Sequence, residues 1–239
     1  MMRNNKRKHT KRFLATTCLF FVGLLTGFAQ FTDDFTDGDF TNSPTWIGDG
    51  GLFTITSGEL NSQSPGAATY YLSTASTLAS DAQWEFFIDL QFNTSGANFV
   101  DIYLMADNSD LNLVNNGYFI RIGGTPDEIL LYKKVSGVET VIINGPTGVT
   151  ETNSFNFRIT RNIADLWNLE YDDGAIGSFV SAGTATDSDV NSCTSFGVLI
   201  EQSSAASAVN NHFFDNFVVG NIPVDLTPPS INSVSVISI

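Results

Sequence analysis

Acidic side chains gather near the start of the chain, in the stretch FTDDFTDGDF at residues 31–40. Carboxylate oxygens suit calcium, a hard cation that binds carboxylates and backbone carbonyls. The stretch does not match the EF-hand template, because no glutamate closes a twelve-residue loop. Three interpretations are therefore open: a calcium loop, a catalytic acid cluster, or a solvated first strand with its turn.

Asp215 is another carboxylate in an apolar setting, since it lies between Phe213 and Phe217 in HFFDNFVV. A carboxylate on an apolar strand face is costly unless it is paired or bound to a metal. If the first and last strands lie side by side, Asp34 meets Asp215. We therefore predict that Asp34 and Asp215 hold one structural calcium ion. The alternative is that Asp34 and Asp37 cap turns and that Asp215 accepts backbone N–H bonds.

Carboxylate pairs are also the catalytic groups of retaining glycosidases, where they lie about 5–5.5 Å apart. On a strand this spacing corresponds to residues i and i+2. The one strand-borne pair with it is Glu170 and Asp172, and Asp172 also suits the turn that follows it. Glu85 and Asp89 share a strand face, but four rises separate them by roughly 13 Å. We therefore assign no catalytic residue and expect a protein that is not an enzyme.

Tyr103, Arg121 and Tyr132 form the candidate ligand-binding set. They lie on three successive predicted strands, each on the face opposite the apolar residues. If these strands form a meander, the three side chains line one outer surface, where exposed aromatic rings beside polar groups suit a sugar. The alternative for Arg121 is an ion pair with Asp101 or a neighbouring acid.

The first 29 residues differ from the rest, because the basic MMRNNKRKHTKR precedes the apolar FLATTCLFFVGLLTGFA. Gly27 and Ala29 supply the small residues that a signal peptidase requires, so we predict a secretory signal at residues 1–29 and cleavage before Gln30. The apolar run is shorter than the about 20 residues of a membrane span. A lipid anchor at Cys18 is the less favoured alternative, because the apolar run continues past it.

Charge and residue scarcity exclude several classes of function. Without the six lysines and arginines of the predicted signal, five basic residues face 25 acidic ones, a net charge of −20. Such a surface repels phosphate backbones, so we expect no nucleic-acid partner. Cys193 then has no disulfide partner and suits a small buried position. His212 is the one remaining histidine, which excludes two-histidine zinc sites and leaves little room for a Ser-His-Asp triad.

Alternating apolar and polar residues dominate the region after the predicted signal, as in WEFFIDLQFN, where Trp84, Phe86 and Ile88 point one way. This period of two is typical of a strand with one face in a core. The same pattern recurs in NFVDIYLMAD, GYFIRIGG, SFNFRITRN, DLWNLEYDDG, SFGVLIEQ and HFFDNFVVG. Turn signals separate these runs, and no segment has a helical stripe. We predict an all-β, antiparallel two-sheet sandwich over residues 30–222.

Residues 223–239 differ in composition, because Pro228 and Pro229 stiffen an extended segment. Ile231, Val234 and Val236 then begin a strand-like pattern. We predict a linker and the first strand of a following domain.

Several of these stretches together resemble one family: DDFTDGDFTNSPTWIGDGGLFTITSGELN, ATYYLST, WEFFIDLQFN, VDIYLMAD, NGYFIRIGG, GTATD and FFDNFVVG. The family is the laminin-G-like, concanavalin A-like sandwich domain of large secreted proteins of gliding bacteria. The likeness spans roughly residues 31–220, and DLTPP resembles the entry to an immunoglobulin-like bacterial module.

The resemblance implies a jelly-roll sandwich that serves as a non-catalytic carbohydrate-binding or adhesion module of a secreted, cell-surface-associated bacterial protein. Its expected partners are a polysaccharide or surface glycan and the further domains of the parent protein. Glucanases of this fold carry Glu-x-Asp-x-x-Glu, which this chain lacks. A glycoside hydrolase with non-standard acids and a structural spacer remain as alternatives.

Overall fold

A computed structural model describes residues 29–150 and 154–224. The basic and apolar parts of the predicted signal, and the tail from residue 225 onwards, lie outside the described residues. Among the residues that are described, no helix is long and apolar enough to span a membrane. The predicted boundaries at residues 29 and 222 stay predictions.

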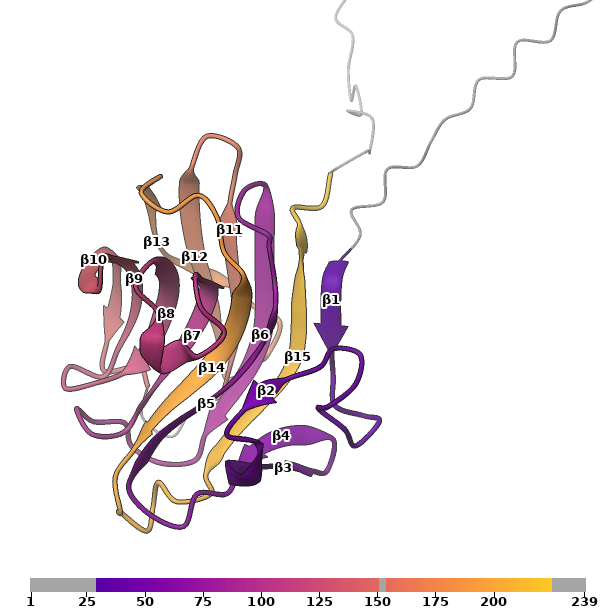
Figure 1. Cartoon of the computed structure of the whole chain (residues 1–239). Helices are drawn as coiled ribbons and strands as arrows, with labels where there is room; N and C mark the ends of the chain where they lie inside the picture. Colours follow the sequence, from indigo (N-terminus) through magenta and orange to yellow (C-terminus); the bar gives the residue numbers. More distant parts are fainter. Residues whose placement is uncertain (1–28, 151–153, 225–239) are drawn as a thin grey trace, which may run out of the picture.

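Two antiparallel sheets face each other across a shared core (Figure 1). The eight-stranded sheet contains, in spatial order, β13 (Val180–Thr186), β12 (Leu166–Asp173), β11 (Ser154–Arg161), β6 (Ala82–Leu90), β15 (His212–Asn221), β4 (Glu59–Ser62) and β3 (Phe53–Thr56), with β1 (Ala29–Asp33) also paired to β15. The seven-stranded sheet contains β10 (Val138–Thr147), β9 (Glu128–Val135), β8 (Gly117–Gly123), β7 (Phe99–Ala106), β14 (Ser195–Gln202), β5 (Ala68–Ala75) and β2 (Ile47–Gly48). The helical residues described are two short 3-10 turns, η1 (Gly50–Leu52) and η2 (Leu111–Leu113).

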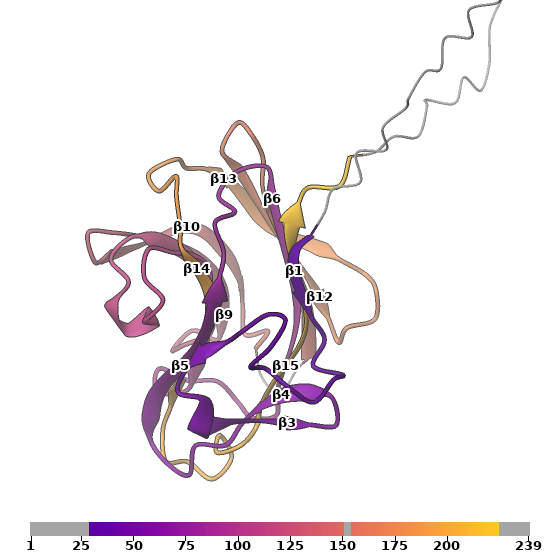
Figure 2. The ribbon, with the colours of Figure 1, turned by 45° about the vertical axis from the view of Figure 1, so that its right-hand side comes forward.

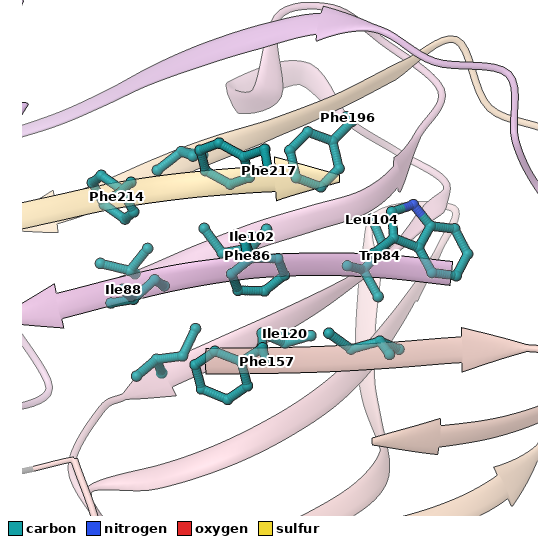
Figure 3. Packing of buried hydrophobic residues seen from close by; sticks show 14 of the residues in the cluster. Trp84, Phe86, Ile88, Ile102, Leu104, Ile120, Phe157, Phe196, Phe214 and Phe217 are labelled. Atoms are coloured by element: carbon teal, nitrogen blue, oxygen red, sulfur yellow. The ribbon is translucent and has the colours of Figure 1, made fainter. Parts of the chain in front are cut away.

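The predicted all-β antiparallel sandwich is confirmed. Strand β6 alternates without a break between buried and half-buried residues, as its sequence indicates. Trp84, Phe86 and Ile88 of this strand meet Ile102 of β7 and Ile120 of β8 across the core (Figure 3). Burying such large apolar side chains contributes about 1.5–3 kcal/mol each, so this layer is the main source of stability.

The outer face of the seven-stranded sheet carries a second apolar cluster, which the sequence did not indicate. Tyr103 of β7 and Phe119 of β8 lie on this face, at 2% and 0% exposure. Leu111 and Val114 belong to the same cluster. They come from the connection at residues 107–116, which contains η2 and covers the middle of the face. The two strands are therefore buried on both faces.

Strand β1 pairs with β15, so the first and last described strands are neighbours, as predicted (Figure 2). The side chains of β15 that face the core differ from those the alternation predicted. A register shift between Asp215 and Val218 accompanies a left-handed conformation at Asn216, with φ of 55°. A bulge of this kind inserts one extra residue and turns the following side chains to the opposite face. Phe214, rather than Phe213, therefore joins Phe217 in the core.

Candidate functional site

A groove of about 320 Å³ opens on the outer face of the seven-stranded sheet, where β7 begins and where β8 turns into β9. The turn at residues 123–126 forms one wall. We call this groove the aromatic groove. The side chains that define it are Phe99, Arg121, Glu128, Leu130, Tyr132 and Asn144.

Close packing against the loop before β7 holds the wall of the aromatic groove in place. Gly123 has a φ of 101°, and a Cβ there would lie 2.6 Å from the Cβ of Thr94, so the position requires glycine. The Thr94 hydroxyl contacts the Asp127 carboxylate and the Thr150 hydroxyl, each at 2.7 Å. These contacts fix the turn before any ligand arrives.

Arg121 lines the aromatic groove and forms a bidentate ion pair beneath it. Its Nε and Nη2 donate to the two carboxylate oxygens of Asp101, each at 2.7 Å. Its guanidinium lies 4.5 Å from the centre of the Phe99 ring and 5.0 Å from that of Tyr132. An ion pair with Asp101 was the alternative that the sequence left open for Arg121, and the structure contains it. In this pair the second terminal nitrogen of Arg121, Nη1, has no hydrogen bond to any described residue.

Burial raises the pKa of Asp101 to about 6, although the hydrogen bonds and charge of Arg121 act against that rise. Asp101 is therefore mostly ionised at pH 7. Burial alone would lower the pKa of Arg121, but the Asp101 carboxylate raises it above its ordinary value. The guanidinium stays charged, and its charge is compensated within the protein.

Three aromatic rings form a ladder across β7, β8 and β9. The ring centres of Tyr103 and Phe119 are 4.9 Å apart, and those of Phe119 and Tyr132 are 5.0 Å apart with planes only 3° from parallel. Tyr132 is half-buried and lines the groove. Tyr103 does not, because the 107–116 connection covers it. The predicted set thus reaches the groove through Arg121 and Tyr132, while Tyr103 supports them from behind.

Sequence reasoning missed four of the six residues that define the groove, namely Phe99, Glu128, Leu130 and Asn144. Phe99 lies two residues before Asp101 on the same face of β7, so the alternation that selected Tyr103 also indicates Phe99. Glu128 and Asn144 gave no comparable signal. They reach the groove because β9 pairs with β8 and β10 pairs with β9.

A second and larger groove, of about 570 Å³, lies near the opposite end of β7. Hydroxyl groups dominate its lining, so we call it the hydroxyl groove; its hydroxyl-bearing residues are Thr45, Ser73, Thr74, Ser109, Thr194 and Ser195. Several of these hydroxyls already donate to the backbone, as Ser73 does to the Ser109 carbonyl at 2.6 Å. Ile47, 50% exposed, is its apolar contribution. It offers a ligand no aromatic ring.

The predicted calcium residues lie near the β1–β15 pair but are engaged locally. One Asp34 oxygen accepts the Thr36 hydroxyl at 2.7 Å and the Thr36 N–H at 3.2 Å, and these bonds lower the pKa of Asp34. Asp215 accepts the Asn216 N–H at 2.7 Å. Burial raises the pKa of Asp215, and the nearby charges of Glu59 and Asp34 add to the rise. Asp37 accepts the N–H of Asp39, as in the turn-capping alternative.

These contacts fit a calcium ion only in part. Calcium takes six to eight oxygen ligands, so two carboxylates would need several carbonyls or waters to complete the shell. In the described part of the chain, no group of three or more His, Cys, Asp or Glu side chains is placed to hold a metal ion. The calcium site at Asp34 and Asp215 stays a prediction.

Removal of calcium with a chelator tests the predicted site at Asp34 and Asp215 directly. If the folded state alone binds calcium at about 100-fold saturation, the ion adds roughly 2.7 kcal/mol to the free energy of unfolding. EDTA should then lower the melting temperature by several degrees, and Asp215→Asn should abolish that sensitivity. Asp49→Asn, away from the terminal strand pair, serves as the control. A melting curve that EDTA leaves unchanged would reduce the two aspartates to turn residues.

Asp33, which precedes Asp34 in the sequence, is a carboxylate to which the sequence analysis assigned no role. It is 9% exposed and accepts the Trp46 indole N–H at 2.7 Å and the Phe35 N–H at 3.0 Å. Trp46 packs against Phe196 and Phe217 between the sheets. Asp33 therefore anchors a core tryptophan and is a structural residue.

The one predicted carboxylate pair with catalytic spacing has a structural role as well. Asp172 accepts hydrogen bonds from the Asn156 amide and from the N–H groups of residues 176–178. Burial alone would raise the pKa of Asp172, but these bonds lower it below its ordinary value. Glu170 lies 3.8 Å from Arg158. A general acid needs a raised pKa, so Asp172 does not suit that role.

No protein-family model matches the chain, and no curated protein matches it significantly. Carbohydrate-binding module CBM66 of Bacillus subtilis superimposes with a TM-score of 0.54 at 16% identity, over 73% of this chain and 94% of that one. The carbohydrate recognition domain of Emp47p gives 0.59 at 10% identity, over 82% and 96%.

The exoplasmic/lumenal domain of VIP36, solved in a Ca²⁺-bound form, also gives a TM-score of 0.59, at 12% identity and over 85% of this chain and 97% of that one. The chain has a concanavalin A-like sandwich fold. Concanavalin A-like sandwiches at such low identity share architecture, and architecture alone does not assign a ligand. The ligand must be argued from the grooves.

Proposed function

We propose that this concanavalin A-like domain is a non-catalytic carbohydrate-binding or adhesion module of a secreted, cell-surface-associated bacterial protein. The aromatic groove carries the proposal, because it combines an accessible tyrosine ring with a hydrogen-bond donor and an acceptor. A sugar ring has an apolar C–H face and polar hydroxyls at its edge, which such a lining complements. The carbohydrate-binding module CBM66, the carbohydrate recognition domain of Emp47p, and VIP36 in its mannose-bound form support the assignment by fold.

Tyr132 provides the stacking surface. Its ring is held parallel to Phe119, which Tyr103 supports in turn, so little side-chain freedom is lost when a sugar binds. Arg121 provides the donor, because the Asp101 pair fixes the guanidinium and leaves Nη1 for a sugar oxygen. Glu128 and Asn144 provide acceptors for sugar hydroxyls on the rim.

The hydrolase alternative lacks support from the acids. Asp172 is held ionised by four hydrogen bonds, and Glu85 pairs with Arg158. Cys193 is buried, and burial raises the pKa of its thiol to about 11, which disfavours the thiolate that a nucleophile requires. A reducing-sugar release assay separates the hydrolase alternative from binding.

Secretion belongs to the same proposal and rests on the sequence. Residues 1–29 would be removed as the signal, residues 30–222 would form the sandwich, and residues 223–239 would lead to a further domain. Mass spectrometry of secreted material is expected to find Gln30 as the first residue. Recovery of Met1 in the secreted protein would contradict the proposal.

Replacing Tyr132 with alanine is expected to weaken polysaccharide binding by about tenfold or more, since a central aromatic contact contributes at least about 1.4 kcal/mol. Affinity electrophoresis in laminarin, mannan or dextran gels measures the change. Tyr132→Phe keeps the ring and should retain most of the affinity. Ile47→Ala, in the hydroxyl groove, is the control.

The outcomes distinguish the alternatives. Loss of binding with Ile47→Ala but not with Tyr132→Ala would move the site to the hydroxyl groove. Binding of no polysaccharide at all, charged or uncharged, would leave the spacer alternative.

A further inference from the structure

We infer that the aromatic groove selects uncharged polysaccharides and rejects polyanionic ones such as sulfated glycans and polyuronates. This inference rests on the proposed function and specifies the ligand class. Anionic polysaccharides are bound through cationic side chains that are free to meet a sulfate or a carboxylate.

Every lysine and arginine in the described residues is already committed to a carboxylate. The five pairs are Arg121 with Asp101, Lys133 with Asp187, Lys134 with Glu139, Arg158 with Glu85, and Arg161 with Asp165. An incoming anion would therefore meet no uncompensated positive charge at any of them, although Nη1 of Arg121 remains free to donate to a ligand oxygen. This part of the chain thus offers a sulfate or uronate no cation whose charge is not already neutralised.

The aromatic groove itself carries an excess of negative charge. Arg121 is balanced by the buried Asp101, and Glu139 lies 3.5 Å from its Nη2. Lys134 is 3.4 Å from Glu139 and compensates that second carboxylate. Glu128 remains on the rim without an ion-pair partner among the described residues. A polyanion would meet this charge at a distance shorter than the Debye length at low salt, so repulsion opposes its binding.

The same groups suit a neutral sugar. The two hydrogens on Nη1 of Arg121 are donors for hydroxyl or ring oxygens, and the Glu128 carboxylate accepts from hydroxyls. The Tyr132 ring contacts the C–H face, which carries no charge. Glu128 thus has two effects: it binds hydroxyls and it repels carboxylates and sulfates.

Matched polysaccharides that differ only in charge test the inference. Laminarin, mannan and dextran are each compared with their sulfated derivatives, and polygalacturonate is compared with its carboxyl-reduced form, at about 20 mM and about 200 mM NaCl. At least one uncharged member is expected to bind with an affinity that changes less than about twofold with salt. Its charged counterpart should bind at least about tenfold more weakly at low salt, and the gap should narrow at high salt.

Glu128→Gln provides the residue-level test. It keeps an acceptor oxygen but removes the charge, so the affinity for the uncharged polymer divided by the affinity for its sulfated derivative should fall, whatever the variant does to the affinity for the uncharged polymer itself. Glu59→Gln makes the same charge change on the eight-stranded sheet. It should leave the ratio of the affinities for the uncharged polymer and for its sulfated derivative as in the wild type.

The possible failures differ. Tighter binding of a sulfated or uronate polymer, with affinity that falls as salt rises, would overturn the charge selection while leaving a carbohydrate-binding function in place. An identical ratio in Glu128→Gln and Glu59→Gln would show that this residue does not set the selection. Absence of binding to every charged and uncharged polymer would reject the proposed function, and the selectivity with it.

Discussion

Replacing Arg161 with alanine is expected to lower the free energy of unfolding by about 3–5 kcal/mol, because a large buried side chain and several of its hydrogen bonds are lost together. The Arg161 side chain is 1% exposed. Its Nη1 donates to the carbonyls of Ala79 and Val190, and its Nη2 to Asp165 and Asn191. Alanine would remove this donor from the buried Val190 carbonyl and from the half-buried Ala79 carbonyl, and it would leave a cavity beside Trp167.

Urea unfolding followed by tryptophan fluorescence measures the change. Arg158→Ala is the matched control, because Arg158 also pairs with a carboxylate but is 36% exposed, and such a pair contributes at most about 1 kcal/mol. Arg161→Lys keeps the charge but not the fork of donors, so an intermediate loss is expected. Equal losses for Arg158→Ala and Arg161→Ala would contradict the role assigned to burial.

Acidification from pH 7 to pH 4 is expected to lower the free energy of unfolding by about 3 kcal/mol through the protonation of His212 alone. His212 has 0% exposure, its Nδ1 lies 3.0 Å from the Ser62 hydroxyl, and its Nε2 has no partner among the described residues. Burial lowers its pKa from the ordinary 6.5 to about 3. The unfolded chain therefore binds a proton first as the pH falls, and the stability is lost progressively between pH 6.5 and pH 3.

His212→Gln removes the ionisation while keeping a group that can bond to Ser62. The measured quantity is the difference in unfolding free energy between the wild type and His212→Gln at each pH. Asp101 has the opposite effect, because its raised pKa lets the folded state bind a proton first below about pH 6. Both proteins keep Asp101, so its contribution cancels in the difference. A difference that is the same at pH 7 and pH 4 would contradict a buried neutral imidazole.

The sequence predicts the sandwich well where a strand has one face in the core and one face outside it. In β6 the inward residues Trp84, Phe86 and Ile88 follow a period of two without interruption, because neighbouring strands flank it on both sides. The prediction that the first and last strands are neighbours is also confirmed. The alternation of β6 follows from local periodicity, which a single sequence expresses directly. The pairing of the terminal strands was expected because sandwiches of this kind usually place them side by side.

Features that depend on distant segments were not predictable in the same way. The burial of Tyr103 comes from Leu111 and Val114, whose connection is too short to show a periodic pattern. The phase of β15 changes at Asn216, where the one local signal is a residue type that tolerates a left-handed conformation. The bond between Asp33 and Trp46 joins residues 13 positions apart. No alternation pattern indicates such a bond.

The pairing of β1 with β15 has a mechanical consequence. The strands are antiparallel, and Ala29 lies opposite Gly220 while Asp33 lies opposite Phe217. A force that pulls residue 29 away from residue 221 acts along the interstrand hydrogen bonds, which run perpendicular to the strands. Those bonds therefore break one after another from the outer end, at low force, instead of sharing the load. The first element to detach under tension is β1, while the seven-stranded sheet and its aromatic groove stay folded.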